Sequence, residues 1–505
     1  MTQTRAGSPL PGYPVPPATM TDLYELTMAA GYWKLGRTGD QAIFTLNFRQ
    51  APFGGGFTIA AGLEGVVAFI EGFTFTAPEL AHLEGLRGND DRPLFDPGFL
   101  DYLAGLRLAV DVDAVPEGTV VFPHEPLVRV SGSLLEAQLL ESALLNLVNF
   151  PTLAATKAAH VALAAGGAPV LEFGLRRAQG PDGGLTASRS AYLGGCAATS
   201  NVLAGRLFGI PVKGTHAHSW VLSFGSEQEA FDAWAEVMPG NAVMLVDTFD
   251  SLEGVANAID TGRRMQARGH RLAGIRLDSG DLAYLSVRAR EMLDAAGFEH
   301  TQIVASNDLD PETIESLQAQ GARIDVWGVG TKLVTCFDQP ALGGVYKLTA
   351  ISSGDGWRTP VKVSSDTAKI TVPGKLGVRR FYDADGTARA DMIWDELHAL
   401  DGSRVIVDPA DSHHRMTIDA SWTSKEVLMP VFRRGERVYD LPSLASSRDH
   451  ARHELGTLHP AILRQLRPHW YPAGLEWSLH VRREALIEAA LVSETMPADG
   501  ERALA

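Results

Sequence analysis

Polar side chains recur just after short apolar runs in the middle of the chain, where they could carry out chemistry. The runs end near residues 173, 214, 247, 278, 306, 328 and 348. The residues that follow them are Arg176, Arg177, Thr215, His216, His218, Asp247, Arg276, Asp278, Asp281, Ser306, Asn307, Asp308, Gly328, Gly330, Thr331 and Lys347. If the runs are strands of a β/α barrel, their carboxyl ends meet on one face and these residues form one catalytic site. Ordinary helix caps and loop polar groups are the alternative interpretation.

Two of these segments suit the binding of anions. Arg176 and Arg177 lie in the glycine-rich stretch GLRRAQGPDGG (174–184), which is too polar for a core element. Guanidinium groups there favour paired hydrogen bonds to a phosphate or carboxylate. The sequence GVGT (328–331) could bind a phosphate through backbone N–H groups at a helix start, although a lone Gly-x-Gly is more often a tight turn. No GxxxxGK[ST] motif occurs, which disfavours a P-loop nucleotidase.

The segment GTHAHSW (214–220) has two interpretations. His216 and His218 after a barrel strand could be the metal-binding pair of an amidohydrolase-type barrel hydrolase, because alternate residues of an extended segment point the same way. Alternatively, one histidine is a nucleophile or acid–base group and the other a bystander. A metal centre would need further histidines at later strand ends, yet none follows the runs ending at 247, 278, 306 or 328. The sequence therefore disfavours a metal held by the protein alone.

The elements that must position these residues alternate between strand and helix. Leu282, Leu285, Ala289 and Leu293 recur at three- and four-residue steps between two apolar runs, as in a crossover helix. Such alternation over residues 134–349 predicts a mostly parallel sheet, in an irregular β/α barrel that need not be complete. This part begins with a long helical segment, about 134–165, that we expect to be interrupted at Pro151.

The rest of the chain predicts other domains. Residues 1–20 are a proline-rich tail that we expect to be disordered. Residues 21–133 read as an N-terminal α/β domain, with a helix after Asp22 and a strand over 42–49. Short strand-like runs over residues 350–440 predict a segment that returns to this domain. Residues 440–505 predict a peripheral, mainly helical C-terminal extension.

Composition limits the classes of function. The 505 residues contain 44 Lys and Arg against 60 Asp and Glu, a formal charge of −16 that disfavours nucleic acids and anionic membranes as partners. Two cysteines allow no disulfide framework. The proline-rich start is no signal peptide, and the longest nearly uncharged stretch, residues 158–171, is too short to span a bilayer. We therefore expect a cytoplasmic protein.

Eight segments together resemble nicotinate phosphoribosyltransferases. They are TDLYELTMAAGYW (21–33), NFRQAPFGGGFTIAAGLE (47–64), EFGLRRAQGPDGG (172–184), SNVLAGRLFGIPVKGTHAHSW (200–220), RLDSGDLAYLS (276–286), ASNDLD (305–310), GVGTKLVTC (328–336) and LGGVYKL (342–348). The resemblance runs from about residue 20 to 381. It implies the type II phosphoribosyltransferase fold, in which an N-terminal α/β domain accompanies an irregular α/β barrel. It also implies a homodimer with shared active sites.

The resemblance implies a reaction between nicotinate and 5-phosphoribosyl 1-pyrophosphate. The products would be nicotinate mononucleotide and pyrophosphate, as a step of NAD biosynthesis. ATP would be a co-substrate that phosphorylates His218, and Mg²⁺ would arrive with the phosphorylated substrates. The residues that match substrate-binding positions are Tyr24, Arg176, Thr215, Arg276, Gly330 and Thr331. His216 stands where many relatives carry an apolar residue, which leaves its effect on the site open.

The chemistry of the residues agrees with that reaction. The anomeric carbon gains oxocarbenium character as pyrophosphate leaves, so cations must stabilise the leaving group and an anion must lie near the sugar. Asp278, Asp281 and Ser306 are candidate contacts to the sugar or to Mg²⁺. We expect Arg276 to bind the carboxylate of nicotinate and Asp278 to be engaged elsewhere, with ribose hydroxyls, Mg²⁺ or neighbouring lysines and arginines. The alternative is that Arg276 pairs with Asp278 only to hold the barrel rim.

Overall fold

The computed structural model describes residues 16–362, 370–400 and 402–495, which fall into two units. Unit 1 consists of residues 1–152 and 341–505, and unit 2 of residues 153–340. These boundaries differ from the expected ones, because helix α6 (Glu141–Ala164) contains the point where unit 2 begins. Pro151 lies inside α6 without interrupting it. The buried residues on either side of it, Val148 and Leu153, provide packing that can outweigh the loss of one backbone hydrogen bond.

Unit 2 contains a parallel six-stranded sheet whose two edge strands are not paired with each other, so the barrel is incomplete. Its order is β7 (Ala198–Thr199), β6 (Val170–Glu172), β11 (Val326–Val329), β10 (Gln302–Ala305), β9 (Gly274–Leu277) and β8 (Val243–Leu245). β10 and β11 carry almost continuous buried apolar residues, as strands covered on both faces do. This confirms the predicted fold class.

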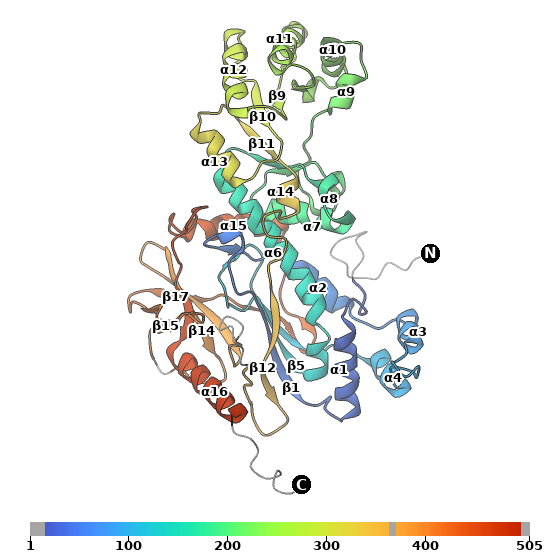
Figure 1. Cartoon of the computed structure of the whole chain (residues 1–505), viewed down its shortest axis with the longest axis vertical. Helices are drawn as coiled ribbons and strands as arrows, with labels where there is room; N and C mark the ends of the chain where they lie inside the picture. Colours follow the sequence, from blue (N-terminus) through green and yellow to red (C-terminus); the bar gives the residue numbers. More distant parts are fainter. Residues whose placement is uncertain (1–15, 363–369, 401, 496–505) are drawn as a thin grey trace. The chain divides into compact units, whose positions relative to one another are not determined.

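Helices follow nearly every strand of this sheet, and α11 and α12 pack against β9 (Figure 1). The helices of unit 2 are α7 (Gly180–Leu193), α8 (Val202–Phe208), α9 (His218–Leu222), α10 (Glu227–Val237), α11 (Ser251–Ala267), α12 (Leu282–Ala295), α13 (Pro311–Ala319) and α14 (Thr331–Val334), with short 3-10 turns at Leu175–Arg177 and Pro239–Asn241. Asp250, Asp281 and Asp310 cap α11, α12 and α13 by accepting backbone N–H groups of the first turn.

Two of the predicted barrel strands were wrong. The run 210–214 contributes only a single bridge, between Val212 and Thr199. The run 344–348 belongs to β12 (Val345–Ser352), which pairs antiparallel with β1 (Gln41–Asn47) in unit 1. Lys347 therefore does not follow a strand of the parallel sheet. A short apolar run does not reveal which sheet it will join, because the partner strand lies far away in the sequence.

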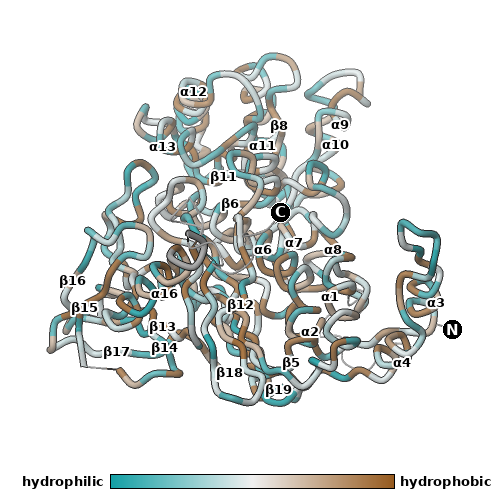
Figure 2. Tube along the Cα trace, turned by 60° about the horizontal axis from the view of Figure 1, so that its bottom comes forward, coloured by the Kyte–Doolittle hydropathy of each residue, from teal (hydrophilic) through white to brown (hydrophobic). Residues whose placement is uncertain are grey.

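The first sheet of unit 1 is antiparallel and six-stranded. Its order is β12, β1, β5 (Val128–Ser133), β3 (Asp111–Ala114), β18 (Met429–Arg433) and β19 (Glu436–Arg437). Figure 2 shows hydrophobic stretches along β5 and β12, with hydrophilic residues in loops such as the one beside α3 (Ala77–Gly85). The same unit contains α1 (Leu23–Lys34), α2 (Leu63–Gly72), α4 (Pro97–Gly105), α5 (Leu134–Gln138), a 3-10 turn at Pro52–Gly54 and the small ladder of β2 (Thr58–Ile59) and β4 (Val120–Val121).

The second sheet of unit 1 is formed by the C-terminal part of the chain. Its order is β16 (Arg415–Thr417), β15 (Val405–Val407), β20 (Ala473–Glu476), β14 (Ala388–Asp395), β13 (Leu376–Tyr382) and β17 (Thr423–Glu426). Residues 440–505 provide α15 (Leu444–Thr457) and α16 (Trp477–Thr495), but also β20, an interior strand. This region is therefore less peripheral than expected, because β20 lies between two other strands.

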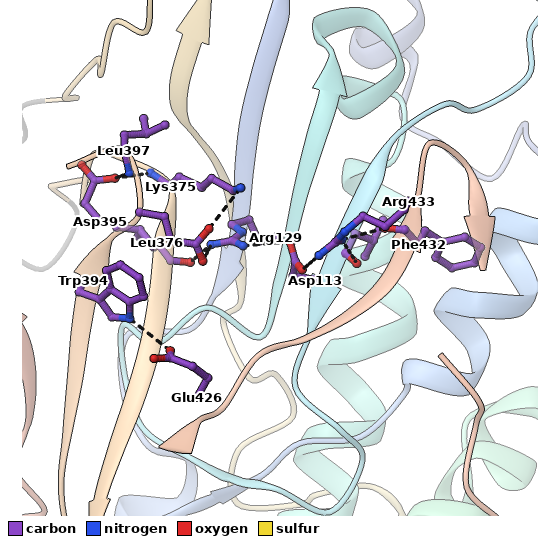
Figure 3. A network of polar contacts seen from close by, with 12 residues as sticks. Asp113, Arg129, Lys375, Leu376, Trp394, Asp395, Leu397, Glu426, Phe432 and Arg433 are labelled. Atoms are coloured by element: carbon purple, nitrogen blue, oxygen red, sulfur yellow. Dashed lines mark hydrogen bonds and ion pairs between the residues drawn. The ribbon is translucent and has the colours of Figure 1, made fainter. Parts of the chain in front are cut away.

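A buried arginine joins the two sheets of unit 1 (Figure 3). Arg129 of β5 donates to Asp113 Oδ2 of β3 at 2.9 Å. Its Nη1 donates to the carbonyl oxygen of Leu376, in β13 of the second sheet, and to Glu396 Oε1, both at 2.7 Å. The side chain is 4% exposed, so these bonds form in a region of low dielectric constant. Among the described residues, no helix is long and apolar enough to cross a membrane.

Candidate active site

Arg276, on β9, forms hydrogen bonds to three other predicted site residues. Its Nη1 donates to Thr215 Oγ1 at 3.0 Å, and its Nη2 to Asp278 Oδ1 at 2.8 Å. Its Nε donates to Ser306 Oγ at 2.8 Å, and that hydroxyl donates in turn to Asp278 Oδ1. β9 and β10 are neighbours in the parallel sheet, so their carboxyl ends bring these side chains together.

The bonds of Arg276 leave part of its guanidinium available. Among the residues that the structure describes, the three bonds use three of its five N–H groups, which leaves one on Nη1 and one on Nη2. Its Cζ lies 5.7 Å from the ring centroid of Phe173, which follows β6. An arginine with two remaining donors beside an aromatic ring can bind a planar anion.

Asp278 is ionised in this arrangement. Burial by itself would raise the pKa of its carboxyl, but the charge of Arg276 and the hydrogen bonds from Ser306 and Arg276 outweigh that effect and lower it. The structure pairs Asp278 directly with Arg276, which is the contact on which the alternative interpretation of Arg276 rests. Arg276 nevertheless keeps the two donors described above.

His218, the first residue of α9, lies next to this cluster. Its Nδ1 is 3.1 Å from Thr248 Oγ1, and its Nε2 is 3.8 Å from Asp278 Oδ2. Its side chain is 41% exposed, so a ligand can reach the ring. An exposed imidazole beside a carboxylate and an arginine can accept a proton or a phosphoryl group.

His216 has a different environment, although it is only two residues away. It is buried, and its Nε2 accepts a hydrogen bond from the Leu245 N–H at 3.2 Å, which leaves Nδ1 to donate to the Ala217 carbonyl at 3.4 Å. Burial lowers its pKa to about 4, and its ring packs edge-on against Trp234 with centroids 5.1 Å apart. Both ring nitrogens are thus occupied by backbone groups. This arrangement does not fit the metal-binding histidine pair of the hydrolase alternative.

Asp247 and Thr248 lie at the end of β8. Asp247 was expected among the strand-end residues of the site, whereas Thr248 was not. Asp247 Oδ2 accepts hydrogen bonds from the Asp278 N–H at 2.9 Å and from Ser279 Oγ at 2.6 Å. It therefore ties the loop after β9 to the end of β8. The position of a threonine directly after a predicted strand end was the one available signal for Thr248.

Arg176, Gly330 and Thr331 lie at two neighbouring strand ends. Arg176 is exposed on the 3-10 turn after β6, and Gly330 and Thr331 lie at the start of α14 after β11. The two segments pack closely: the Phe173 N–H donates to the Val329 carbonyl at 2.8 Å, and a Cβ at Gly174 would lie 2.3 Å from Val334. Glycine is required there because any side chain would overlap α14.

Two further predicted residues occupy other positions. Asp281 caps α12 by accepting the Tyr284 N–H at 3.1 Å, which accounts for one of its oxygens. Tyr24 lies in unit 1, on α1, and is 45% exposed. Burial of its hydroxyl and the nearby charges of Glu141 and Glu25 raise its pKa to about 12. The place of Tyr24 in a substrate site stays a prediction.

Unit 1 contains a small pocket of its own. Lys347 lines this pocket together with Arg49 and His124. Burial lowers the pKa of His124 to about 4, so the positive charge there comes from Arg49 and Lys347. Sequence reasoning did not find this pocket, because its lining comes from strands that are far apart in the chain.

Comparison with known proteins assigns the chain to one family. The models of the nicotinate phosphoribosyltransferase N-terminal domain, family and C-terminal domain match residues 19–149, 169–372 and 377–481. The nicotinate phosphoribosyltransferase of Bacillus subtilis is 41% identical over 482 residues, which cover 94% of this chain and 96% of the relative. The human protein of that name is 37% identical, with 94% and 97% covered.

Solved structures agree with this result. The crystal structure of human nicotinic acid phosphoribosyltransferase has a TM-score of 0.78 and 34% identity, covering 92% of this chain and 99% of that one. A nicotinate-nucleotide pyrophosphorylase from Pyrococcus furiosus, with a TM-score of 0.66 and 20% identity, shares the fold over 87% of this chain and 95% of its own. The chain belongs to the nicotinate phosphoribosyltransferase family.

Proposed function

We propose that the protein joins nicotinate to 5-phosphoribosyl 1-pyrophosphate and releases nicotinate mononucleotide and pyrophosphate, in the cytoplasmic biosynthesis of NAD. The observation that carries this proposal is the Arg276 cluster. The guanidinium has two N–H groups left, Phe173 lies beneath it, and His218 lies beside its partner Asp278. The relatives' names support the same activity.

The chemistry assigns a role to each group. The carboxylate of nicotinate binds the remaining N–H groups of Arg276, which orients the pyridine nitrogen toward the anomeric carbon. The nitrogen forms a bond to that carbon as the bond to pyrophosphate breaks, and the negative charge of Asp278 can stabilise the oxocarbenium character of the sugar. Arg176 and the backbone of Gly330 and Thr331 are the candidates for binding phosphate groups.

ATP enters as a second substrate at the same site. Its γ-phosphoryl group would form a P–N bond with His218 as its bond to ADP breaks, and water would later release phosphate from the histidine. Mg²⁺ would neutralise charge on the phosphate groups. Arg276 and Ser306 already bond Asp278, and Asp281 caps a helix, so we expect phosphate oxygens rather than these carboxylates to hold the ion.

Product analysis tests the proposal. The purified protein is incubated with phosphoribosyl pyrophosphate and either nicotinate or nicotinamide, with and without ATP, and the nucleotide products are separated by chromatography. We expect nicotinate mononucleotide and pyrophosphate, in amounts that ATP increases. The absence of product with nicotinate, or equal use of both pyridines, would contradict the proposal.

A further inference from the structure

The imidazole of His218 is held by hydrogen bonding more than by packing. Its side chain is 41% exposed, so few neighbouring atoms restrict its rotation. The backbone beneath it is fixed, because Trp220 of the same helix donates from Nε1 to the Ala230 carbonyl at 3.0 Å and packs against Trp234. The ring itself can still turn about two torsion angles. A group that binds a ring nitrogen therefore decides its orientation.

Thr248 supplies that group, and hydrogen bonds hold the two residues before it. Its hydroxyl oxygen lies 3.1 Å from Nδ1 of His218. Directly before it, the Val246 N–H donates to the Arg276 carbonyl at 3.1 Å, and Asp247 binds the loop after β9 through the Asp278 N–H. The strand end that carries Thr248 is thus tied to the strand end that carries Arg276 and Asp278.

We propose that Thr248 is a positioning residue for the phosphorylation of His218, an inference that rests on the proposed phosphohistidine. A threonine hydroxyl both donates and accepts, so it can bond Nδ1 whether or not that nitrogen carries the proton. Asp278, when ionised, can only accept. When Thr248 accepts the proton of Nδ1, the lone pair of Nε2 is free to form the bond to phosphorus as the bond to ADP breaks. The hydroxyl keeps the ring in this orientation while the charge of the ring changes.

The experiment compares Thr248→Val, which removes the hydroxyl at nearly constant volume, with Thr248→Ser, which keeps it. Formation of acid-labile phosphoenzyme from radiolabelled ATP is followed in a rapid-quench instrument, and the dissociation constant of ATP is measured separately. We expect Thr248→Val to slow phosphorylation at least tenfold, since a lost orienting bond misplaces the nucleophile. Thr248→Ser should remain within about threefold of wild type. The affinity for ATP and the melting temperature should change little in either variant.

Controls separate this inference from the proposed function. His218→Ala should form no phosphoenzyme, and Thr313→Val, on α13 of the same unit, should behave as wild type. If the wild-type protein forms no phosphoenzyme, or His218→Ala forms as much, the phosphohistidine and the role of Thr248 are both wrong. If the wild type is phosphorylated on His218 and Thr248→Val reacts equally fast, only the role of Thr248 is wrong. The role of Thr248 would also be wrong if Thr248→Val lost ATP affinity in parallel with its rate, or if Thr248→Ser were phosphorylated as slowly as Thr248→Val.

Discussion

Arg276 and Asp278 are bonded through Nη2 and Oδ1 at 2.8 Å, although they are only two residues apart at the end of a strand. The aspartate offsets the charge of the arginine and fixes its plane, and Ser306 and Thr215 complete the set of acceptors. A fixed guanidinium loses little entropy when it binds a planar carboxylate. The pairing therefore prepares Arg276 for a ligand while leaving it two donors.

Replacing Arg276 should remove the preference for nicotinate. Arg276→Ala loses charge-assisted hydrogen bonds worth about 1.5–3 kcal/mol each, so kcat/KM for nicotinate should fall at least tenfold. The kcat/KM for nicotinamide, which has no carboxylate, should fall less. The measurement is kcat/KM for both pyridines in wild type, Arg276→Ala and the control Arg263→Ala, an exposed arginine paired with Asp260. An equal loss for both substrates, or unfolding of Arg276→Ala, would mean that Arg276 does not recognise the carboxylate.

Replacing His218 should uncouple ATP from the reaction. His218→Ala removes the proposed phosphoryl acceptor, so ATP should no longer increase product formation, whereas the reaction without ATP should continue. The measurement is the initial rate of nucleotide formation with and without ATP. His270→Ala, an exposed histidine of the same unit, serves as the control. A normal ATP response in His218→Ala would show that the phosphate is carried elsewhere.

His216 should make the stability of the protein depend on pH. Burial lowers its pKa to about 4, below the ordinary value near 6.5, so between these values the unfolded chain binds a proton that the folded chain does not. The contribution of His216 to the free energy of unfolding is complete above about pH 6.5. It falls by roughly 1.4 kcal/mol per pH unit as the pH drops toward 4. Urea unfolding of wild type and His216→Gln at pH 7, 5.5 and 4.5 tests this. As the pH falls from 7 to 4.5, we expect the free energy of unfolding to decrease more in the wild type than in His216→Gln. Equal decreases in the two proteins would refute the role of His216.

Loss of Arg129 should destabilise unit 1 strongly. Arg129→Ala removes the partner of Asp113 Oδ2, although Arg433 still bonds Oδ1, and it also removes the donor to the Leu376 carbonyl. Each buried group left unsatisfied typically costs about 1–3 kcal/mol. Arg379→Ala is the matched control, because its ion pair with Glu426 in the second sheet is partly exposed and should contribute less than about 1 kcal/mol. The free energy of unfolding in urea gives both values. Similar losses in the free energy of unfolding for the two variants would show that the buried network of Figure 3 stabilises the protein no more than an exposed ion pair does.

Tyr24 tests whether active sites are shared in a homodimer. If Tyr24 of one chain completes the site that contains His218 of the other, then mixing Tyr24→Ala with His218→Ala places both lesions in one site and restores the second site. We therefore expect ATP-stimulated activity to reappear in verified heterodimers. Its absence there would indicate that each site is built from a single chain.

Much of the site followed from the sequence, because strand ends in a parallel sheet converge wherever the strands are paired. Arg276 and Ser306 come together because β9 and β10 are neighbours, and both strands were visible as apolar runs. The separate roles of His216 and His218 could not be read in this way, since they depend on which ring is covered by Trp234 and which remains exposed.

The pairing of strands that are far apart in the sequence was the other feature that could not be predicted. The run that became β12 is a short apolar run like those of the barrel strands, and only its ladder of seven residue pairs with β1 shows that it belongs to the antiparallel sheet. Phe173 was seen only as the last residue of an apolar run. Its place near Arg276 depends on the neighbouring strand β11, where a Cβ at Gly328 would lie 2.8 Å from the ring.

The discontinuity of unit 1 has a consequence for biosynthesis. Every residue of β1 pairs with β12, and the whole of unit 2 is encoded between these two strands. During translation, β1 therefore leaves the ribosome long before its partner exists, while the strands and helices of unit 2 can already pair among themselves. Until β12 arrives, one edge of the first sheet is open to pairing with other nascent chains. The nascent protein thus passes through a period in which it depends on chaperones or on fast synthesis to avoid aggregation.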